Sequence, residues 1–331
     1  MPNYSSEQQL IDRYFSRHQS ACDSVEVGVG DDAAIVKPPS HSKLYITTDT
    51  LNVDVHFFAD CKAEYVGHKS LAVNLSDIAA MGAIPLWATL SLSLPEIDHA
   101  WLDGFSNGLY RLAELHNVKL VGGDLVKGPL SITIQVTGCT DKNTALLRSG
   151  CQTDDLIYVS GHLGDAAMGL NILKNNLKIK LTKNEEKHFL DKLHTPSPRF
   201  DVSTPITKYA TSAIDISDGL LIDLQRMLTM SNKAATIDIE KIPVSAEMQR
   251  HINDTSDIDN VLVAAEDYEL IFTINALDKP RLEQYFSSEN ILVTQIGSIN
   301  EGSGKENSGI TLLHKGQEYT LPTVAGFDHF S

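Results

Sequence analysis

Aspartates recur where this sequence changes from one predicted element to the next, and they are its residues best suited to chemistry. Strand ends carry functional sites in α/β proteins, because short loops there hold side chains in fixed positions. The aspartates of this kind are Asp31 and Asp32 after VEVGVG, Asp49 in ITTDT, Asp124 in LVGGD, and Asp215 and Asp218 in AIDISDGL. Asp77 differs, since it interrupts the apolar face of a predicted helix in NLSDIAAMG.

Taken together, these carboxylates indicate a site for divalent cations. Any one of them alone is well explained as a helix cap or a turn residue. If several converge, their repulsion raises pKa values and costs stability unless cations intervene, and hard cations prefer oxygen ligands. Mg²⁺ held by carboxylates shares its remaining ligands with substrate phosphates, so phosphoryl transfer is the leading reaction class.

The familiar nucleotide-binding motifs do not occur in the sequence. It has neither a GxxxxGK[ST] loop nor the protein-kinase motif set. GVGDD resembles the start of a dinucleotide fingerprint, but its two acids would repel a pyrophosphate unless a metal lay between them. GGDLVKGP offers close backbone approach, a carboxylate and Lys127 for phosphate, and a plain turn explains it equally well.

The sequence predicts no covalent nucleophile and no general base. No cysteine stands in a nucleophile motif and no HExxH pair occurs, so covalent catalysis and zinc hydrolysis both lack support. A kinase whose acceptor is already a phosphate needs no base, because a monoester with a second pKa of about 6 is largely dianionic at neutral pH.

Composition sets the class of protein and its partners. A chain of 331 residues, 42% hydrophobic and 21% charged, predicts a globular protein of two domains. Its net charge of -16 argues against nucleic acid or an anionic membrane as partner. The four cysteines have no CxxC spacing, and neither a secretory signal nor a membrane span is evident, so we expect a cytoplasmic protein.

Hydrophobic periodicity predicts alternating helices and strands, with a restart near Gly150 that we interpret as the domain boundary, giving domains 1–149 and 150–331. The predicted helices are 6–18, 63–81, 100–116, 164–176 and 221–230. The predicted strands are 25–30, 44–50, 86–95, 119–124, 131–140, 155–161, 235–240, 266–274 and 291–299, and SAIDISDGL at 212–220 leads as a further strand into the last helix. Proline-rich HTPSPRF predicts a loop between helices, and EGSGKENSG an exposed turn.

Across almost its whole length the chain resembles the thiamine-monophosphate kinase family, of the AIR synthetase (PurM-like) superfamily. That superfamily also holds selenophosphate synthetase and a hydrogenase-maturation protein. The resemblance rests on GVGDDAAIV, TTDTLNVDVHF, GHKSLAVNLSDIAAMGAIP, GGDLVKGPLSITI, LLRSG, PSPR, SAIDISDGL, EDYEL and the terminal GFDHF. It implies an α/β (α+β) protomer, with an N-terminal domain that binds ATP and Mg²⁺ and pairs in a homodimer, and a C-terminal domain that completes the substrate site.

The same resemblance assigns roles position by position. It implies several Mg²⁺ ions held by Asp32, Thr47, Thr48, Asp49, Asp77, Asp124, Asp215 and Asp218. It implies contacts to ATP by Gly123, Asp124, Arg148 and Ser217. It implies that His56, Glu266 and Phe327 bind thiamine monophosphate, whose thiazolium cation suits aromatic faces and carboxylates.

Simpler interpretations of four of these residues stay open on sequence alone. Packing of the C-terminal tail explains Phe327 about as well. His56 fits a hydrogen-bonded loop or core histidine, Glu266 a solvated turn, and Arg148 a surface ion pair.

The chain also departs from the family pattern at two places. Ala264 and Ala265 replace glycines before EDYEL, and Leu125 and Lys127 replace threonine and arginine after GGD. The first change narrows the available backbone conformations if the site uses positive φ, and the second makes phosphate contact less bidentate.

The sequence therefore predicts direct in-line transfer of the γ-phosphoryl of ATP to thiamine monophosphate, giving thiamine diphosphate. Two rival hypotheses remain. A superfamily synthetase would act on another acceptor, although Cys22 lacks the glycine-rich loop expected for selenophosphate synthesis. A silent binding protein would use the same pocket to sense ATP or thiamine phosphates.

Overall fold

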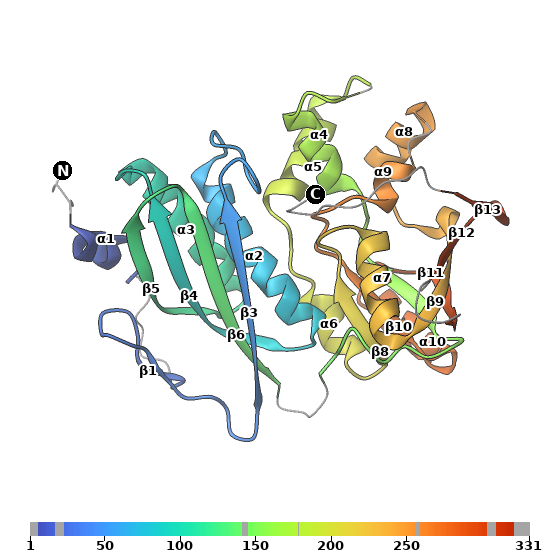
Figure 1. The fold of residues 1–331 in the computed structure, drawn as a ribbon, viewed down its shortest axis with the longest axis horizontal. Helices are drawn as coiled ribbons and strands as arrows, with labels where there is room; N and C mark the ends of the chain where they lie inside the picture. Colours follow the sequence, from blue (N-terminus) through green and yellow to red (C-terminus); the bar gives the residue numbers. More distant parts are fainter. Residues whose placement is uncertain are drawn as a thin grey trace. The chain divides into compact units, whose positions relative to one another are not determined.

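The structure, a computed structural model, describes residues 6–16, 23–140, 145–177, 179–255, 258–302 and 309–320. Phe327, the GFDHF motif, Cys22 and most of the expected turn at 301–309 lie outside these residues. The chain divides into two units (Figure 1). Unit 1 contains Met1–Ile78 and Ala83–Thr144, and unit 2 contains Ala79–Gly82 and Ala145–Ser331. The domain boundary expected between residues 149 and 150 lies a few residues after the point, between Thr144 and Ala145, where the chain passes from unit 1 to unit 2.

Unit 1 is built on a four-stranded sheet of order β3-β6-β4-β5, with α2 and α3 on one face (Figure 1). Its elements are α1 Glu7–Tyr14, β1 Val25–Val27, β2 Ile35–Val36, β3 Lys43–Asn52, α2 Ala63–Ala80, β4 Ile84–Leu94, α3 His99–Leu115, β5 Lys119–Lys127 and β6 Ser131–Thr140. The two helices meet backbone to backbone. A Cβ atom on Gly67 would lie 2.0 Å from the carbonyl oxygen of Phe105, and one on Gly108 1.9 Å from that of Glu64.

Strand pairing fixes which side chains of unit 1 share a face. β3 and β6 are antiparallel, β6 and β4 are antiparallel, and β4 and β5 are parallel. β6 reads SITIQVTGCT, and its alternate residues Ile132, Ile134 and Val136 are buried against the helices. This alternation, which the sequence predicts, follows from the two-residue period of a pleated strand with one packed face.

Unit 2 holds a seven-stranded sheet of order β13-β12-β9-β11-β7-β10-β8, in which only the β12–β9 pair is parallel. Its strands are β7 Leu156–Ser160, β8 Ala210–Asp215, β9 Lys233–Asp238, β10 Leu270–Ile274, β11 Val293–Glu301, β12 Ile310–His314 and β13 Gln317–Tyr319. Its helices are α4 Asp165–Leu173, α5 Lys183–His194, α6 Phe200–Ile206, α7 Leu220–Ser231, α8 Ala246–Thr255, α9 Asp259–Leu262, α10 Lys279–Ser288, and the short 3₁₀ turns η1 Ile239–Lys241 and η2 Ala276–Asp278.

The unit 2 sheet is covered on both faces. Ile157, Val159 and Ile271 belong to one apolar core, while Tyr158 and Phe272 belong to another on the opposite face. β10 is therefore buried at all five positions, which explains its unbroken apolar run LIFTI. Both units mix helices and strands, so the expected two-domain α/β class is confirmed.

Two aspartates that we expected at strand ends lie inside strands. Asp49 stands opposite Ile134 in β3, and that strand continues to Asn52 because β6 is long enough to pair with it. Asp124 stands opposite Ser91 in β5, which pairs with β4 as far as Lys127. Conversely, β1 ends at Val27, so Asp31 and Asp32 belong to a loop. The expectation of strand ends was correct for Asp215, the last residue of β8.

None of the helices in the described part of the chain has the length and apolarity needed to cross a bilayer.

Candidate functional site

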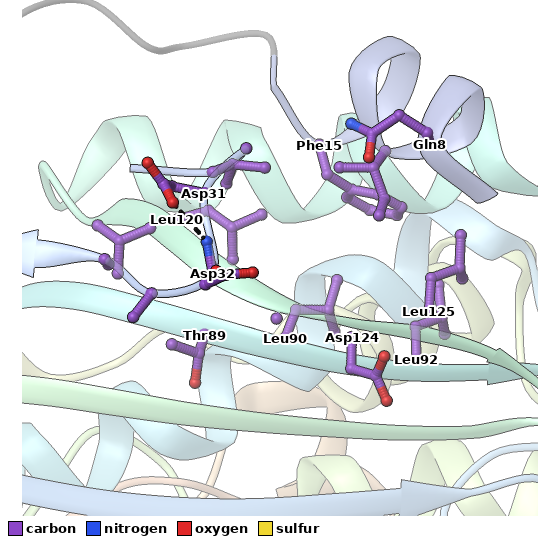
Figure 2. A pocket seen from close by; sticks show the side chains of 18 residues that line it. Gln8, Phe15, Asp31, Asp32, Thr89, Leu90, Leu92, Leu120, Asp124 and Leu125 are labelled. Atoms are coloured by element: carbon purple, nitrogen blue, oxygen red, sulfur yellow. Dashed lines mark hydrogen bonds between the residues drawn. The ribbon is translucent and has the colours of Figure 1, made fainter. Parts of the chain in front are cut away.

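A pocket of about 490 Å³ opens in unit 1 between α1, the loop at residues 29–34, and strands β4 and β5. Figure 2 shows Asp31 and Asp32 on the loop, Asp124 on β5, Gln8 on α1, and Phe15 directly after that helix. The backbone N–H of Asp32 donates to Asp31 Oδ1 over 2.8 Å, which orients the loop. The pocket thus combines a carboxylate-lined part with an apolar wall.

Gly123 lines this pocket with backbone atoms alone. A Cβ atom there would lie 1.9 Å from the carbonyl oxygen of Leu90, so β5 and β4 approach too closely for any side chain. Three predicted site residues, Asp32, Gly123 and Asp124, therefore line a single pocket. The departure Leu125 is a buried core residue, and Lys127 is exposed at the end of β5.

A second group of predicted residues meets between β3 and α2. The hydroxyl of Thr47 donates to Asp77 Oδ2, and Asp49 lies on the same face of β3 as Thr47. Burial and then the charge of Asp77 raise the pKa of Asp49 from 3.8 to about 7. Two half-buried carboxylates that repel each other form an arrangement that a cation stabilises.

Thr48 and Asp124 occupy the other face of the sheet. The side chain of Thr48 alternates with those of Thr47 and Asp49, and it is exposed. The ladders connect Asp124 with Ser91, Ser91 with Thr133, and Thr133 with Thr50, so Asp124 shares the face of Thr50 and Thr48. Unit 1 therefore separates the predicted metal residues into two groups.

His56 lies in a tight turn after β3. The N–H of Asn52 donates to His56 Nδ1 over 3.0 Å, so the ring proton of a neutral imidazole is on Nε2. Asp54 adopts φ 62° and donates its N–H to the carbonyl of Phe57, which closes the turn. Lys69 from α2, only 4% exposed, donates to the carbonyl oxygen of His56 over 3.3 Å.

In unit 2, two adjoining segments collect four predicted residues. Asp215 ends β8, and Ser217 and Asp218 follow in the turn that leads into α7. The N–H of Glu266 donates to the carbonyl of Ser217 over 2.8 Å. The predicted nucleotide and metal residues of SAIDISDGL thus lie beside the predicted acceptor residue of EDYEL.

Sequence reasoning missed the acid that shapes this turn. Asp223 on α7 is fully buried, and its Oδ2 accepts N–H groups from Ser217, Asp218 and Gly219 at 3.0, 3.0 and 3.2 Å. Burial raises its pKa, while these bonds and Arg226 act in the opposite direction. The spacing of Asp223, four residues after glycine in SDGLLID, is the only sequence signal for this contact.

The EDYEL segment has unusual backbone and buried anchors. Glu266 and Tyr268 have φ values of 71° and 49°, whereas Ala264 and Ala265 do not have positive φ, so the alanine departures impose no strain. Asp267 accepts the N–H of Gly164 over 2.8 Å at the start of α4. Burial, together with the charges of Asp165 and Glu269, raises the pKa of Asp267 well above its ordinary value.

Arg199 of the PSPR motif completes these anchors. It forms a buried ion pair with Glu269, and the Ser160 hydroxyl donates to Glu269 over 2.5 Å. Arg148 by contrast is exposed, in a segment beside β8 where Ala213 donates its N–H to the carbonyl of Leu147.

The predicted acids supply only oxygen ligands, which suits Mg²⁺. Within the described residues, no three His, Cys, Asp or Glu side chains converge on one point that would hold a metal ion. The Asp49–Asp77 pair still fits a cation, because burial and mutual repulsion disfavour its doubly charged form. Any metal bound there would take further ligands from water or from phosphates.

Comparison with known proteins places these residues in a family. Residues 30–140 match the profile of the AIR synthase related protein N-terminal domain, and residues 152–307 match that of its C-terminal domain. The thiamine-monophosphate kinase of Escherichia coli K12 is 40% identical over 326 residues, covering 98% of each chain. This chain belongs to the thiamine-monophosphate kinase family.

Solved structures of the thiamine-monophosphate kinase family have the same fold. The kinase of Stenotrophomonas maltophilia K279a matches with a TM-score of 0.82 and 38% identity, covering 94% of this chain and 96% of that one. The AaThiL complex with AMPPCP and TMP matches with a TM-score of 0.76 and 32% identity, covering 98% and 97%. The resemblance inferred from the motifs is thereby confirmed.

Proposed function

We propose that this protein transfers the γ-phosphoryl group of ATP to thiamine monophosphate with the help of Mg²⁺. The products would be ADP and thiamine diphosphate, so the reaction would be the last step of thiamine diphosphate biosynthesis. The observation that carries the proposal is 40% identity to a thiamine-monophosphate kinase over 98% of both chains. Cys61, Cys139 and Cys151 are thiols that form no disulfide, which suits the cytoplasm as the proposed compartment.

Asp32, Asp49, Asp77 and Asp124 of unit 1, and Asp215 and Asp218 of unit 2, would hold the metal ions, with Thr47 and Thr48 beside them. Mg²⁺ bound there would neutralise two polyanions and fix their relative geometry. Gly123 and Asp124 line a pocket whose apolar wall, with Ile11 and Phe15, suits a nucleotide base. Arg148 and Ser217 would contact the same nucleotide.

The transfer would be a single displacement. An acceptor phosphate oxygen forms a bond to the γ-phosphorus while the bond from that phosphorus to the β,γ-bridging oxygen breaks. ADP leaves with the electron pair. Because the acceptor phosphate is already largely dianionic at neutral pH, no side chain has to remove a proton. This agrees with a site rich in carboxylates and positioned donors.

His56 and Glu266 are proposed to bind thiamine monophosphate, together with Phe327, which lies outside the described residues. The Nε2–H of His56 would donate to the phosphate, because the bond from Asn52 fixes that tautomer. The carboxylate of Glu266 would attract the thiazolium cation.

The direct test is product analysis with purified protein, ATP and Mg²⁺. We expect thiamine diphosphate from thiamine monophosphate, and no product from free thiamine or aminoimidazole precursors. A product from another acceptor would favour a superfamily synthetase. Tight nucleotide binding without ADP release would favour a binding protein, and labelled phosphate trapped on the protein after ATP alone would rule out direct transfer.

We also propose that the site is shared between two copies of this chain, paired through unit 1. Asp49 and Asp124 lie on β3 and β5, the two edge strands, with β6 and β4 between them. At a strand spacing of about 4.8 Å the two edges are roughly 14 Å apart, too far for one metal ion to bridge. The face of Asp124 also exposes Ile46 and Val126, 66% and 45% accessible, which a second copy would cover.

Mixing two inactive variants tests this sharing. Asp49→Asn and Asp124→Asn should each be inactive alone, while their mixed dimers contain one intact site and recover about a quarter of wild-type turnover. Sedimentation of the wild-type protein checks the dimer directly. A dimer whose mixed variants stay inactive would show that each site is contained in one chain.

A further inference from the structure

The Ser217–Gly219 turn is hydrogen-bonded to one buried acid, Asp223. Asp223 has no solvent exposure, and one of its oxygens accepts three consecutive backbone N–H groups within 3.2 Å. A buried carboxylate is unfavourable unless its hydrogen bonds are made, and here they are made by a single turn. The position of Asp223 is thus coupled to the conformation of that turn.

The second oxygen of Asp223 extends the network to a predicted metal residue. Arg226 Nη1 lies 2.6 Å from Asp223 Oδ1 and 2.5 Å from Asp218 Oδ2. One guanidinium nitrogen therefore joins the two carboxylates. Because its partner Asp223 is fully buried, Arg226 restricts where the Asp218 carboxylate lies.

The opposite side of the turn is enclosed by backbone. Gly219 has φ 127°, and a Cβ atom there would lie 2.9 Å from the carbonyl oxygen of Val263. The carbonyl of Ser217 accepts the N–H of Glu266 over 2.8 Å. The turn lies between Asp223 and the segment leading into EDYEL, so its shape depends on contacts from both sides.

We propose that Asp223 is a positioning residue that presents Ser217 and Asp218 to nucleotide and metal, and that Arg226 fixes the Asp218 carboxylate through it. This inference rests on the proposed function, in which Ser217 contacts ATP and Asp218 binds Mg²⁺. Loss of the Asp223 charge weakens its hydrogen bonds to three backbone N–H groups at once. The acceptor residue Glu266 is less affected, because EDYEL has its own anchors in Asp267 and the Arg199–Glu269 pair.

The test compares Asp223→Asn with a matched variant, Asp155→Asn. Asp155 is also a buried acid of unit 2, 1% exposed, and accepts from the N–H of Gln152 at 2.8 Å and the hydroxyl of Thr211 at 2.6 Å. No site role is assigned to it. Both variants lose the charge of a buried acid, but only one of these acids holds the Ser217–Gly219 turn.

The main readout is calorimetric binding of the non-hydrolysable analogue β,γ-methylene ATP over a series of Mg²⁺ concentrations, without acceptor. We expect Asp223→Asn to weaken Mg²⁺-dependent binding by about 10–100-fold, the usual effect of losing a residue that orients metal ligands. Asp155→Asn should lower the unfolding temperature and leave this binding unchanged. In turnover assays, the KM for ATP should rise in Asp223→Asn more than the KM for thiamine monophosphate.

Arg226→Gln provides a second variant in which the buried acid remains. We expect weaker Mg²⁺-dependent binding, in the same direction as Asp223→Asn and smaller, because Asp218 loses its tether. Tighter Mg²⁺ binding in Arg226→Gln would show that Arg226 competes with the metal and would overturn its positioning role. If Asp223→Asn does not fold, this variant still decides whether the network serves the metal.

Two outcomes separate this inference from the proposed function. Equal losses of stability in Asp223→Asn and Asp155→Asn, with unchanged nucleotide binding in both, would make Asp223 merely structural and overturn the inference alone. Wild-type protein that binds the analogue with Mg²⁺ but forms no thiamine diphosphate would overturn the proposed function, and the binding comparison would still decide the role of Asp223. Absence of any Mg²⁺-dependent binding by wild-type protein would overturn both.

Discussion

The acidic groups of the two units are balanced in different ways. In unit 1, burial and the charge of Asp77 raise the pKa of Asp49 to about 7. In unit 2, Asp218 and Asp223 share Arg226, and Glu269 pairs with Arg199. These carboxylates of unit 2 are therefore paired with cations of their own chain. In unit 1, Asp49 and Asp77 repel each other, and a divalent cation bound between them would relieve that repulsion.

This difference separates two tasks among the residues with proposed roles. Carboxylates that repel each other favour metal binding, since a divalent cation relieves their repulsion. Carboxylates with built-in partners instead fix backbone and side-chain positions, as Asp223 does for the Ser217–Gly219 turn. Substitutions of the Asp49–Asp77 pair should therefore affect metal-dependent activity more than stability. Breaking the Arg199–Glu269 pair, which contacts no proposed metal ligand, should do the reverse.

Asp77→Asn is the strongest test of this contrast. We expect turnover at saturating Mg²⁺ to fall by about 10³-fold, the range seen when a main electrostatic contact of a transition state is removed. The metal-free unfolding temperature should not fall, because the substitution removes a charge that raises the pKa of Asp49 and asparagine still accepts from Thr47. Turnover and the metal-free unfolding temperature, measured on the same preparation, test both expectations. A variant that unfolds while keeping its metal affinity would contradict the assignment.

Arg199→Met tests the paired group of unit 2. Arg199 and Glu269 side chains are only 13% and 8% exposed, so removing the cation should lower the free energy of unfolding by about 3–5 kcal/mol. The matched variant Lys187→Met breaks an exposed i,i+4 pair with Asp191, for which less than about 0.5 kcal/mol is expected. Urea unfolding of both variants measures the difference. Similar small losses would mean that the Arg199–Glu269 pair does not stabilise unit 2.

Much of the fold followed from the sequence, because periodicity reports directly on burial. The helix expected at 63–81 is α2, Ala63–Ala80, and the alternation in SITIQVTGCT gave β6 and its buried face. Loop HTPSPRF does separate two helices, since α5 ends at His194 and α6 begins at Phe200. These features depend on local pattern and on proline chemistry.

The candidate site was less predictable, since its contacts join residues distant in sequence. The predicted acids were found from their types, but their division between two faces of the unit 1 sheet depends on strand register. Sequence reasoning did not predict the positioning contacts of Asp223, Arg199 and Lys69. An acid on a helix or an arginine after a proline is common in sequences, and neither pattern indicates a buried partner. The expectation that strands end at Asp49 and Asp124 was wrong. The position at which each strand ends depends on how far its neighbouring strand continues, which the local sequence does not show.

Asp49 should make the metal-free protein sensitive to pH. Its folded-state pKa of about 7 exceeds the ordinary value of 3.8, so the native state holds this proton more tightly than the unfolded state. The stability it contributes is complete below about pH 4 and is lost as pH rises through about 7. We expect the metal-free unfolding temperature to fall between pH 5 and pH 8, and less steeply in Asp49→Asn. Saturating Mg²⁺ should oppose this fall, and an identical slope in both proteins would exclude Asp49 as its source.

Lys69→Met gives the smallest expected effect and shows a buried cation of unit 1 in a different role. Its ammonium donates to the carbonyl oxygen of His56, so it steadies the turn that carries a proposed acceptor residue. Losing one such hydrogen bond costs about 1–2 kcal/mol, so the KM for thiamine monophosphate should rise about 5–30-fold while kcat changes little. The exposed Lys37→Met serves as control and should leave both constants unchanged. A fall in kcat at constant KM would instead connect Lys69 with the transferring phosphoryl group, and unit 1 would then supply its own cation to the reaction.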